Sequence, residues 1–287
     1  MIAVHSIADM RAERARMDAR NGRPQRVGLV PTMGYLHAGH AAVIRRARAE
    51  CGHVVVSIFV NPLQFGPNED FARYPRDLAR DRAVCEEAGA DAVFAPSVQE
   101  MYGRDGAATV VHVRGLGDHL CGASRPGHFD GVCTVVAKLL QIVQPARAYF
   151  GRKDAQQWRI VRRMAQDLSI PAEIVPCETV REEDGLAMSS RNAYLNPRER
   201  RAAPAIWQTL SWVREQVLAG RRDAPALREE ALLRLAAEPL LRPDYLSFVD
   251  DESLQPTDRL AAGRRTLCAA AAFIGSTRLI DNVELDT

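Results

Sequence analysis

The apolar positions in the first 185 residues alternate between short runs and segments with helical spacing. Short apolar or β-branched runs predict strands at residues 27–30, 54–60, 92–95, 148–151 and 174–177. Apolar positions spaced three and four apart predict a helix over residues 131–144, and helices are also expected at 41–50, 78–87 and 154–168. This alternation predicts an α/β fold in which a parallel sheet carries helices on both faces.

The pattern changes after about residue 185. Asn196-Pro197 opens a long helical region over residues 198–218, and a second helix is expected over 224–237. Strand-like pieces follow at residues 245–249, 266–272 and 278–280. We therefore expect two domains, an α/β domain over residues 1–185 and a smaller α+β domain over residues 186–287.

Charge and cysteine content narrow the class of protein. Lys and Arg number 38 against 36 Asp and Glu, a net charge of +2, which favours neither a nucleic-acid nor a membrane partner. The six cysteines form no C-x-x-C pair, so we interpret them as buried free thiols. The N-terminus lacks the apolar core of a signal peptide, and the run at 267–275 is too short to span a bilayer. We expect a soluble, cytoplasmic protein.

The strongest chemical signal is the segment Pro31-Thr32-Met33-Gly34-Tyr35-Leu36-His37-Ala38-Gly39-His40. It follows the first predicted strand and opens a helix, which is where open α/β sheets bind ligands. A helix N-terminus offers backbone N–H groups to phosphate, and Gly39 allows close approach. Two imidazoles three residues apart can donate hydrogen bonds to a phosphate as negative charge builds on it.

Three further clusters lie at strand ends or at the domain boundary. Lys153, in Phe150-Gly151-Arg152-Lys153-Asp154, is suited to phosphate, and Gln157 lies one helical turn later. Asn61 and Gln64 follow another strand, and their neutral amides suit hydroxyls and a carboxylate. Met188-Ser189-Ser190-Arg191-Asn192 offers hydroxyls and a guanidinium to triphosphate oxygens. Each cluster alone is typical of a surface loop, whereas together they indicate a nucleotide site.

The His-x-Gly-His motif resembles that of the nucleotidyltransferases that include class I aminoacyl-tRNA synthetases. Over nearly its whole length the chain resembles the pantoate–β-alanine ligase family. The matching stretches, in the family's order, are residues 31–40, 57–66, 74–76, 125–132, 150–157, 179–192 and 277–282. The resemblance implies a Rossmann-like domain, a smaller C-terminal domain that closes over the active site, and a cytoplasmic homodimer.

The activity implied by the resemblance is the ATP- and Mg²⁺-dependent condensation of (R)-pantoate with β-alanine. It would proceed through a pantoyl-adenylate, release AMP and pyrophosphate, and serve pantothenate and coenzyme A biosynthesis. Such a transfer depends on positioning and electrostatic stabilisation and needs no enzyme nucleophile.

The resemblance also implies roles for individual residues. His40 would be the proton donor, with His37 and Lys153 as further catalytic residues. Gln64 would contact pantoate and β-alanine, Gln157 would contact pantoate, and Asp81 would lie near Mg²⁺. The implied ATP site comprises Met33, Gly34, Tyr35, Leu36, His37, Ala38, Gly39, His40, Gly151, Arg152, Lys153, Asp154, Val180, Met188, Ser189, Ser190 and Arg191.

The chain departs from the family pattern at Ala38, Cys121 and Arg152, where glutamate is usual. Cys121 would remove an acidic group near the metal, and Arg152 would reverse a charge beside Lys153. From the residues alone, three alternatives stay open. They are a nucleotidyltransferase that stops at a nucleotide product, a non-catalytic nucleotide- or RNA-binding module, and a metal hydrolase. The pair Gln64 and Gln157 argues against the first, and the absence of a basic patch argues against RNA. His37-x-x-His40 lacks a nearby carboxylate, which disfavours a hydrolase.

Overall fold

The computed structural model describes residues 1–19, 26–67 and 69–286, which form two compact units. Unit 1 comprises residues 1–113, 125–152 and 157–178, and unit 2 comprises 114–124, 153–156 and 179–287. The sequence predicted a single domain boundary, between residues 185 and 186. In the structure, residues 179–185 also belong to unit 2, as do two earlier segments, 114–124 and 153–156.

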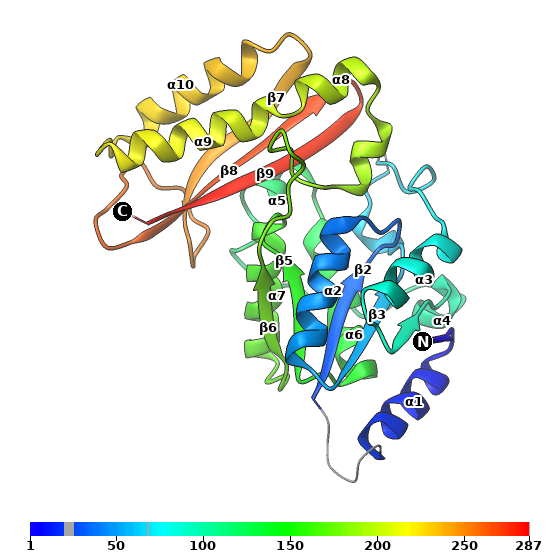
Figure 1. Ribbon diagram of the computed structural model, residues 1–287. Helices are drawn as coiled ribbons and strands as arrows, with labels where there is room; N and C mark the ends of the chain where they lie inside the picture. Colours follow the sequence, from blue (N-terminus) through cyan, green and yellow to red (C-terminus); the bar gives the residue numbers. More distant parts are fainter. Residues whose placement is uncertain (20–25, 68, 287) are drawn as a thin grey trace. The chain divides into compact units, whose positions relative to one another are not determined.

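Unit 1 is built on a six-stranded parallel sheet (Figure 1). Its strands are β1 (Ile2–Val4), β2 (Val27–Thr32), β3 (His53–Ile58), β4 (Ala92–Phe94), β5 (Arg147–Gly151) and β6 (Glu173–Cys177), in the order β1-β4-β3-β2-β5-β6. The chain runs from β2 outward through β3 to β4, then returns to place β5 on the other side of β2. Because the strand order reverses there, the carboxyl ends of β2 and β5 flank the switch point where such sheets bind ligands.

Helices cover both faces of this sheet, as predicted from the sequence. The helices are α1 (Ile7–Ala19), α2 (Ala38–Glu50), α3 (Leu78–Glu87), α4 (Val98–Tyr102), α6 (His128–Val143) and α7 (Ala155–Asp167). Val27, Leu29 and Val30 of β2 are at most 2% exposed, although their side chains point alternately to opposite faces. Burial on both faces explains why this strand reads as a continuous apolar run.

Unit 2 contains a three-stranded antiparallel sheet with helices packed against it. Its strands are β7 (Leu241–Asp250), β8 (Arg265–Ile274) and β9 (Thr277–Asp286), and its helices are α5 (Cys121–Ser124), α8 (Pro197–Ala202), α9 (Ala205–Leu218) and α10 (Ala224–Ala236). Ile206, Leu210, Leu227, Phe248 and Cys268 belong to its core. Leu120 and Ala155, from the two earlier segments, pack with Val249 and Leu267 in a smaller cluster.

One helix prediction was wrong. The sequence predicted a single helix over 198–218, whereas the structure has α8 and α9 with a break at Ala203–Pro204. Proline has no backbone N–H and its ring clashes with the preceding turn, so a new helix begins there. The prediction of buried free thiols is confirmed for all six cysteines. No helix among the described residues has the length and apolar character needed to cross a membrane.

Candidate active site

The His-x-Gly-His loop, residues 33–40, joins β2 to α2 at the carboxyl edge of the sheet. Its backbone turns through left-handed conformations at Gly34 (φ +85°) and Tyr35 (φ +53°). Asp81, in the first turn of α3, holds this turn: its carboxylate oxygens accept hydrogen bonds from Tyr35 N (2.8 Å) and Leu36 N (2.7 Å). A Cβ on residue 34 would lie 2.9 Å from Asp81 Oδ2, so the turn requires glycine.

The two histidines of this loop cap α2 through their own rings. His37 Nδ1 accepts from Gly39 N (3.1 Å), and His40 Nδ1 accepts from His37 N (3.3 Å). The ring centroids lie 4.1 Å apart. Because each Nδ1 accepts a backbone N–H, a neutral ring carries its proton on Nε2. Both imidazoles are therefore oriented to donate from Nε2 at a helix N-terminus, which suits a phosphate.

Gln64 lies next to this loop. It ends the 3₁₀ helix η2 (Pro62–Gln64), is 8% exposed, and donates from Nε2 to Met33 Sδ at 2.9 Å. Its Oε1 accepts from Asn61 Nδ2 (3.2 Å). The amide thus has its oxygen held by Asn61 and its NH₂ group directed toward the loop that carries the histidines.

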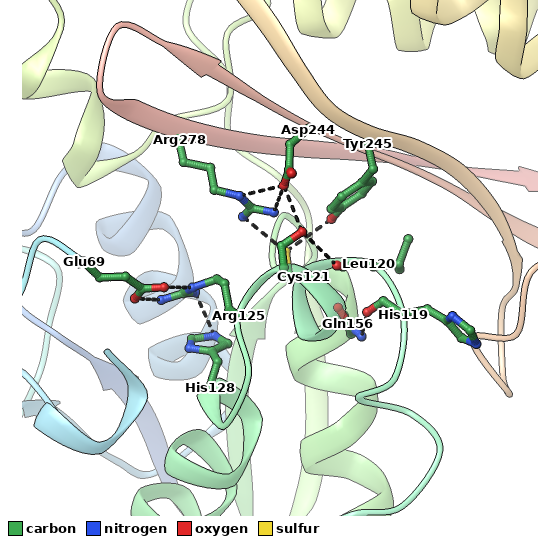
Figure 2. Close-up of polar contacts among 11 residues, drawn as sticks. Glu69, His119, Leu120, Cys121, Arg125, His128, Gln156, Asp244, Tyr245 and Arg278 are labelled. Atoms are coloured by element: carbon green, nitrogen blue, oxygen red, sulfur yellow. Dashed lines mark hydrogen bonds and ion pairs between the residues drawn. The ribbon is translucent and has the colours of Figure 1, made fainter. Parts of the chain in front are cut away.

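The main chain of Gln64 is also held. Its carbonyl accepts from His128 Nδ1 (2.8 Å) and from Arg125 Nη2 (3.2 Å). Arg125 in turn pairs with both carboxylate oxygens of Glu69 (Figure 2). Burial by itself raises the pKa of Glu69, but the hydrogen bond and positive charge of Arg125 outweigh it and hold that pKa below its usual value. No role for Glu69, Arg125 or His128 was predicted from the sequence.

The end of β5 and the start of α7 supply the remaining predicted residues of unit 1. Gly151 ends β5, and nothing lies within 4 Å of where its Cβ would be. Arg152 pairs with Glu178 (3.1 Å), so the reversed charge at this position is neutralised within unit 1. Gln157 is half-buried on α7.

Unit 2 holds the other predicted ATP residues. Lys153 and Ser189 line one small cavity together with Asn192 and Asp281, and Lys153 O accepts from Asn282 Nδ2 (2.9 Å). Asp154 is half-buried beside Lys153. The structure thus brings Lys153 together with the loop of residues 188–192, called the Ser189 loop below, which is far from it in the sequence.

The Ser189 loop is braced by its neighbours in unit 2. Met188 N donates to Val180 O (3.0 Å), and Ser189 Oγ accepts from Arg191 N (3.2 Å), capping the 3₁₀ helix η3 (Ser190–Tyr194). The residues before this loop are held by Arg181, whose guanidinium pairs with Asp281 (2.6 and 3.0 Å). The same guanidinium stacks on Trp207, 3.4 Å from the ring centroid.

Cys121, one of the departures from the family pattern, lies in a polar cluster of unit 2. Its Sγ is 3.2 Å from Tyr245 Oη and 3.5 Å from Arg278 Nη1, and Arg278 pairs with Asp244 (Figure 2). Burial by itself lowers the pKa of Arg278, but its polar neighbours, Cys121 and Asp244 foremost, hold that pKa above its usual value. Arg278 thus has an acidic partner in Asp244, 2.7 Å away, although residue 121 is a cysteine and not the glutamate usual in the family.

The described residues contain no group of three or more His, Cys, Asp or Glu side chains placed to hold a metal ion. Asp81, predicted to lie near Mg²⁺, is 1% exposed and both its oxygens accept backbone N–H groups. Its geometry supports a role in holding the loop, and its role as a metal ligand stays a prediction. The donor set fits an ion that arrives bound to phosphates, since Mg²⁺ usually keeps several waters and few protein ligands.

The sheet and the loop at the carboxyl end of β2 define the class, an α/β enzyme of the His-x-Gly-His nucleotide-binding type. The family model for pantoate-beta-alanine ligase matches residues 2–284, and this chain belongs to the pantoate–β-alanine ligase family. Pantothenate synthetase of Roseiflexus castenholzii is 54% identical over 286 residues, with 100% of each chain covered.

Solved structures agree with this assignment. The pantothenate synthetase of Thermus thermophilus is 50% identical, with 100% of each chain covered and a TM-score of 0.91. The pantoate-beta-alanine ligase of Francisella tularensis, solved in complex with beta-gamma ATP and beta-alanine, is 33% identical, with a TM-score of 0.78. The alignment covers 99% of this chain and 97% of that one. The chain is thus an enzyme, and its fold class is the one predicted from its sequence.

Proposed function

We propose that this enzyme condenses (R)-pantoate with β-alanine through a pantoyl-adenylate, releasing AMP and pyrophosphate. One observation carries the proposal. The loop at the N-terminus of α2 presents two Nε2–H donors, and Met33 of the same loop contacts the Gln64 amide. Donors suited to phosphate and a donor suited to a hydroxy acid are therefore adjacent within unit 1, as a reaction between a carboxylate and the α-phosphate of ATP requires.

In the first step, a carboxylate oxygen of pantoate attacks the α-phosphorus and the bond to pyrophosphate breaks. Charge builds on the phosphoryl oxygens, where the Nε2–H groups of His37 and His40 donate hydrogen bonds. In the second step, the neutral amine of β-alanine attacks the acyl carbon, the C–O bond breaks, AMP leaves, and the nitrogen loses one proton to the solvent. No covalent enzyme intermediate is needed, and the six thiols are all buried.

Residues of both units take part in this proposal. In unit 1, residues 33–40, Gly151 and Arg152 bind ATP, Gln64 and Gln157 bind pantoate, and Gln64 also contacts β-alanine. In unit 2, the ATP-binding residues are Lys153, Asp154, Val180, Met188, Ser189, Ser190 and Arg191. The Francisella tularensis relative, solved with beta-gamma ATP and beta-alanine, supports two of the substrates.

We further propose that Mg²⁺ accompanies ATP and neutralises its phosphates, and that the enzyme is a cytoplasmic homodimer. The predicted closure of the C-terminal domain over the active site stays a prediction. Light scattering of the purified enzyme tests the dimer: a mass close to that of one 31.7 kDa chain would contradict it.

The decisive experiment follows the oxygen atoms of pantoate. Pantoate labelled with heavy oxygen in its carboxylate should give AMP that carries one labelled oxygen, because the bridging oxygen leaves with AMP. A mechanism through an acyl-phosphate would release ADP, and a nucleotide-binding module would release nothing. Unlabelled AMP, with pantothenate still forming, would exclude the adenylate.

A further inference from the structure

Behind Gln64 lies a buried chain of hydrogen bonds within unit 1. Tyr102, the last residue of α4, donates from its hydroxyl to Asn61 Oδ1 at 2.8 Å. Asn61 is 1% exposed and Tyr102 is 9% exposed. The chain continues from Asn61 Nδ2 to Gln64 Oε1 and from Gln64 Nε2 toward the His-x-Gly-His loop.

The orientation of the Asn61 amide is set by two backbone groups. Its Oδ1 accepts from Leu63 N (3.3 Å), and its Nδ2 donates to Gly131 O (3.0 Å). An N–H can only donate and a carbonyl can only accept, so the amide cannot be flipped. The tyrosine hydroxyl must therefore act as the donor to Oδ1.

The orientation of Gln64 follows from that of Asn61. The second Nδ2 hydrogen of Asn61 requires an acceptor, which places Gln64 Oε1 against it and turns the NH₂ group of Gln64 away. Every hydrogen bond in the series runs in one direction, from Tyr102 through Asn61 to Gln64. Aligned hydrogen bonds of this kind polarise one another and strengthen the last donor.

We propose that Tyr102 is a positioning residue that orients the Gln64 amide as a hydrogen-bond donor to the acid substrate. This inference rests on the proposed function, because it takes Gln64 as the residue that binds pantoate. Burial raises the pKa of Tyr102 above its ordinary value, so the hydroxyl keeps its proton throughout the working pH range. Tyr102 itself acts only through Asn61 and Gln64.

The test is Tyr102→Phe, which keeps the ring and removes the hydroxyl. Loss of one aligned hydrogen bond should raise the KM for pantoate about 3–10-fold, with kcat and the KM for ATP within about twofold of the unsubstituted enzyme. An equal rise in both KM values, or an unchanged KM for pantoate, would overturn the proposal.

Tyr149→Phe is the matched control. Tyr149 is also buried in unit 1, and its hydroxyl bonds Glu50 and Cys51. These two residues lie at the opposite end of α2 from the histidines, roughly 18 Å along a helix of this length. This substitution should lower the melting temperature comparably and leave the KM for pantoate unchanged. A rise equal to that of Tyr102→Phe would mean that both effects are merely structural.

A double-mutant cycle with Gln64→Ala completes the test. Once the Gln64 amide is gone, Tyr102→Phe should add less than about a twofold change in the KM for pantoate. An undiminished effect in that background would overturn the proposal. Failure of the proposed function looks different, since the unsubstituted enzyme would then form no pantothenate.

Discussion

At the scale of single residues, each histidine of the His-x-Gly-His loop uses its two ring nitrogens differently. Nδ1 caps the helix, and the proposed function gives Nε2 the hydrogen bond to phosphate. An asparagine amide can replace Nδ1, whereas the longer glutamine amide reaches the position of Nε2. We therefore predict that His40→Asn keeps the melting temperature and lowers adenylation roughly 10²–10⁴-fold, the span for loss of a positioned donor.

His40→Gln is the companion variant, and we expect it to retain more adenylation than His40→Asn because it keeps a donor near Nε2. Pantoate-dependent AMP formation measures both. Near-normal turnover of folded His40→Asn would remove His40 from the mechanism.

Two roles are to be distinguished for Asp81, namely holding the loop by hydrogen bonds and binding a metal ion. In Asp81→Asn only one oxygen remains for two backbone N–H groups, so the turn at residues 34–36 loses a hydrogen bond. We predict a KM for ATP raised about tenfold, the equivalent of about 1.4 kcal/mol, at an unchanged Mg²⁺ requirement. Titration of Mg²⁺ at saturating ATP decides the matter, because a raised requirement would assign Asp81 to the metal.

The Glu69–Arg125 pair makes stability depend on pH. The pKa of Glu69 is lower in the folded protein than its ordinary value of 4.5. The unfolded chain therefore binds the proton first, and the contribution of this carboxylate is present above pH 4.5 and lost as pH falls through the folded pKa. We predict that Glu69→Gln lowers the free energy of unfolding at pH 7 and that the gap narrows toward pH 3.

Urea unfolding between pH 3 and pH 7 measures this difference. Glu87→Gln is the control, because Glu87 is 79% exposed and its contact with Arg45 is long, at 3.5 Å. The free energy of unfolding of Glu87→Gln should change with pH in the same way as that of the unsubstituted protein. A constant gap for Glu69→Gln across the range would contradict the proposed linkage.

At the scale of elements, the ion pair between β7 and β9 stabilises the antiparallel sheet of unit 2. Asp244 and Arg278 are 22% and 17% exposed, whereas Asp286 and Arg265 are 80% and 51% exposed. Removing one charge from a largely buried pair leaves the other unpaired. We predict that Asp244→Asn lowers the free energy of unfolding by about 1–3 kcal/mol, discounted for partial solvent access.

The matched change Asp286→Asn, on β9, should cost less than about 0.5 kcal/mol. Denaturant unfolding of the two variants gives the comparison. Equal losses would mean that burial of Arg278 does not set the effect. Cys121→Ser, which keeps a polar atom beside Arg278, should stay close to the unsubstituted protein.

At the scale of the whole molecule, the proposal makes ATP binding depend on both units. A ligand at 100 times its Kd stabilises the folded state by about 2.7 kcal/mol. We predict that ATP raises the melting temperature, and that His40→Asn in unit 1 and Ser190→Ala in unit 2 each remove most of that rise. Ser276→Ala, in the exposed turn between β8 and β9, should keep it. A full shift in Ser190→Ala would confine ATP binding to unit 1.

Local patterns in the sequence were sufficient to predict much of this protein. Strands β2 to β6, helices α2, α3, α6 and α7, and the place of His37 and His40 between a strand and a helix were predicted, because apolar periodicity and turn chemistry act over a few residues. Strand β1 and helices α1 and α4 were not predicted. The break at Pro204 was missed although its cause is also local. The sequence motifs were also sufficient to identify the family by resemblance.

Only the tertiary structure decided which groups hold the site. Asp81 meets Leu36 across 45 positions, Tyr102 meets Asn61 across 41, and His128 meets the Gln64 carbonyl across 64. Packing likewise assigned residues 114–124 and 153–156 to unit 2. No local pattern encodes such contacts, because a hydrogen bond between distant residues forms only after sheet order and helix packing have brought donor and acceptor together.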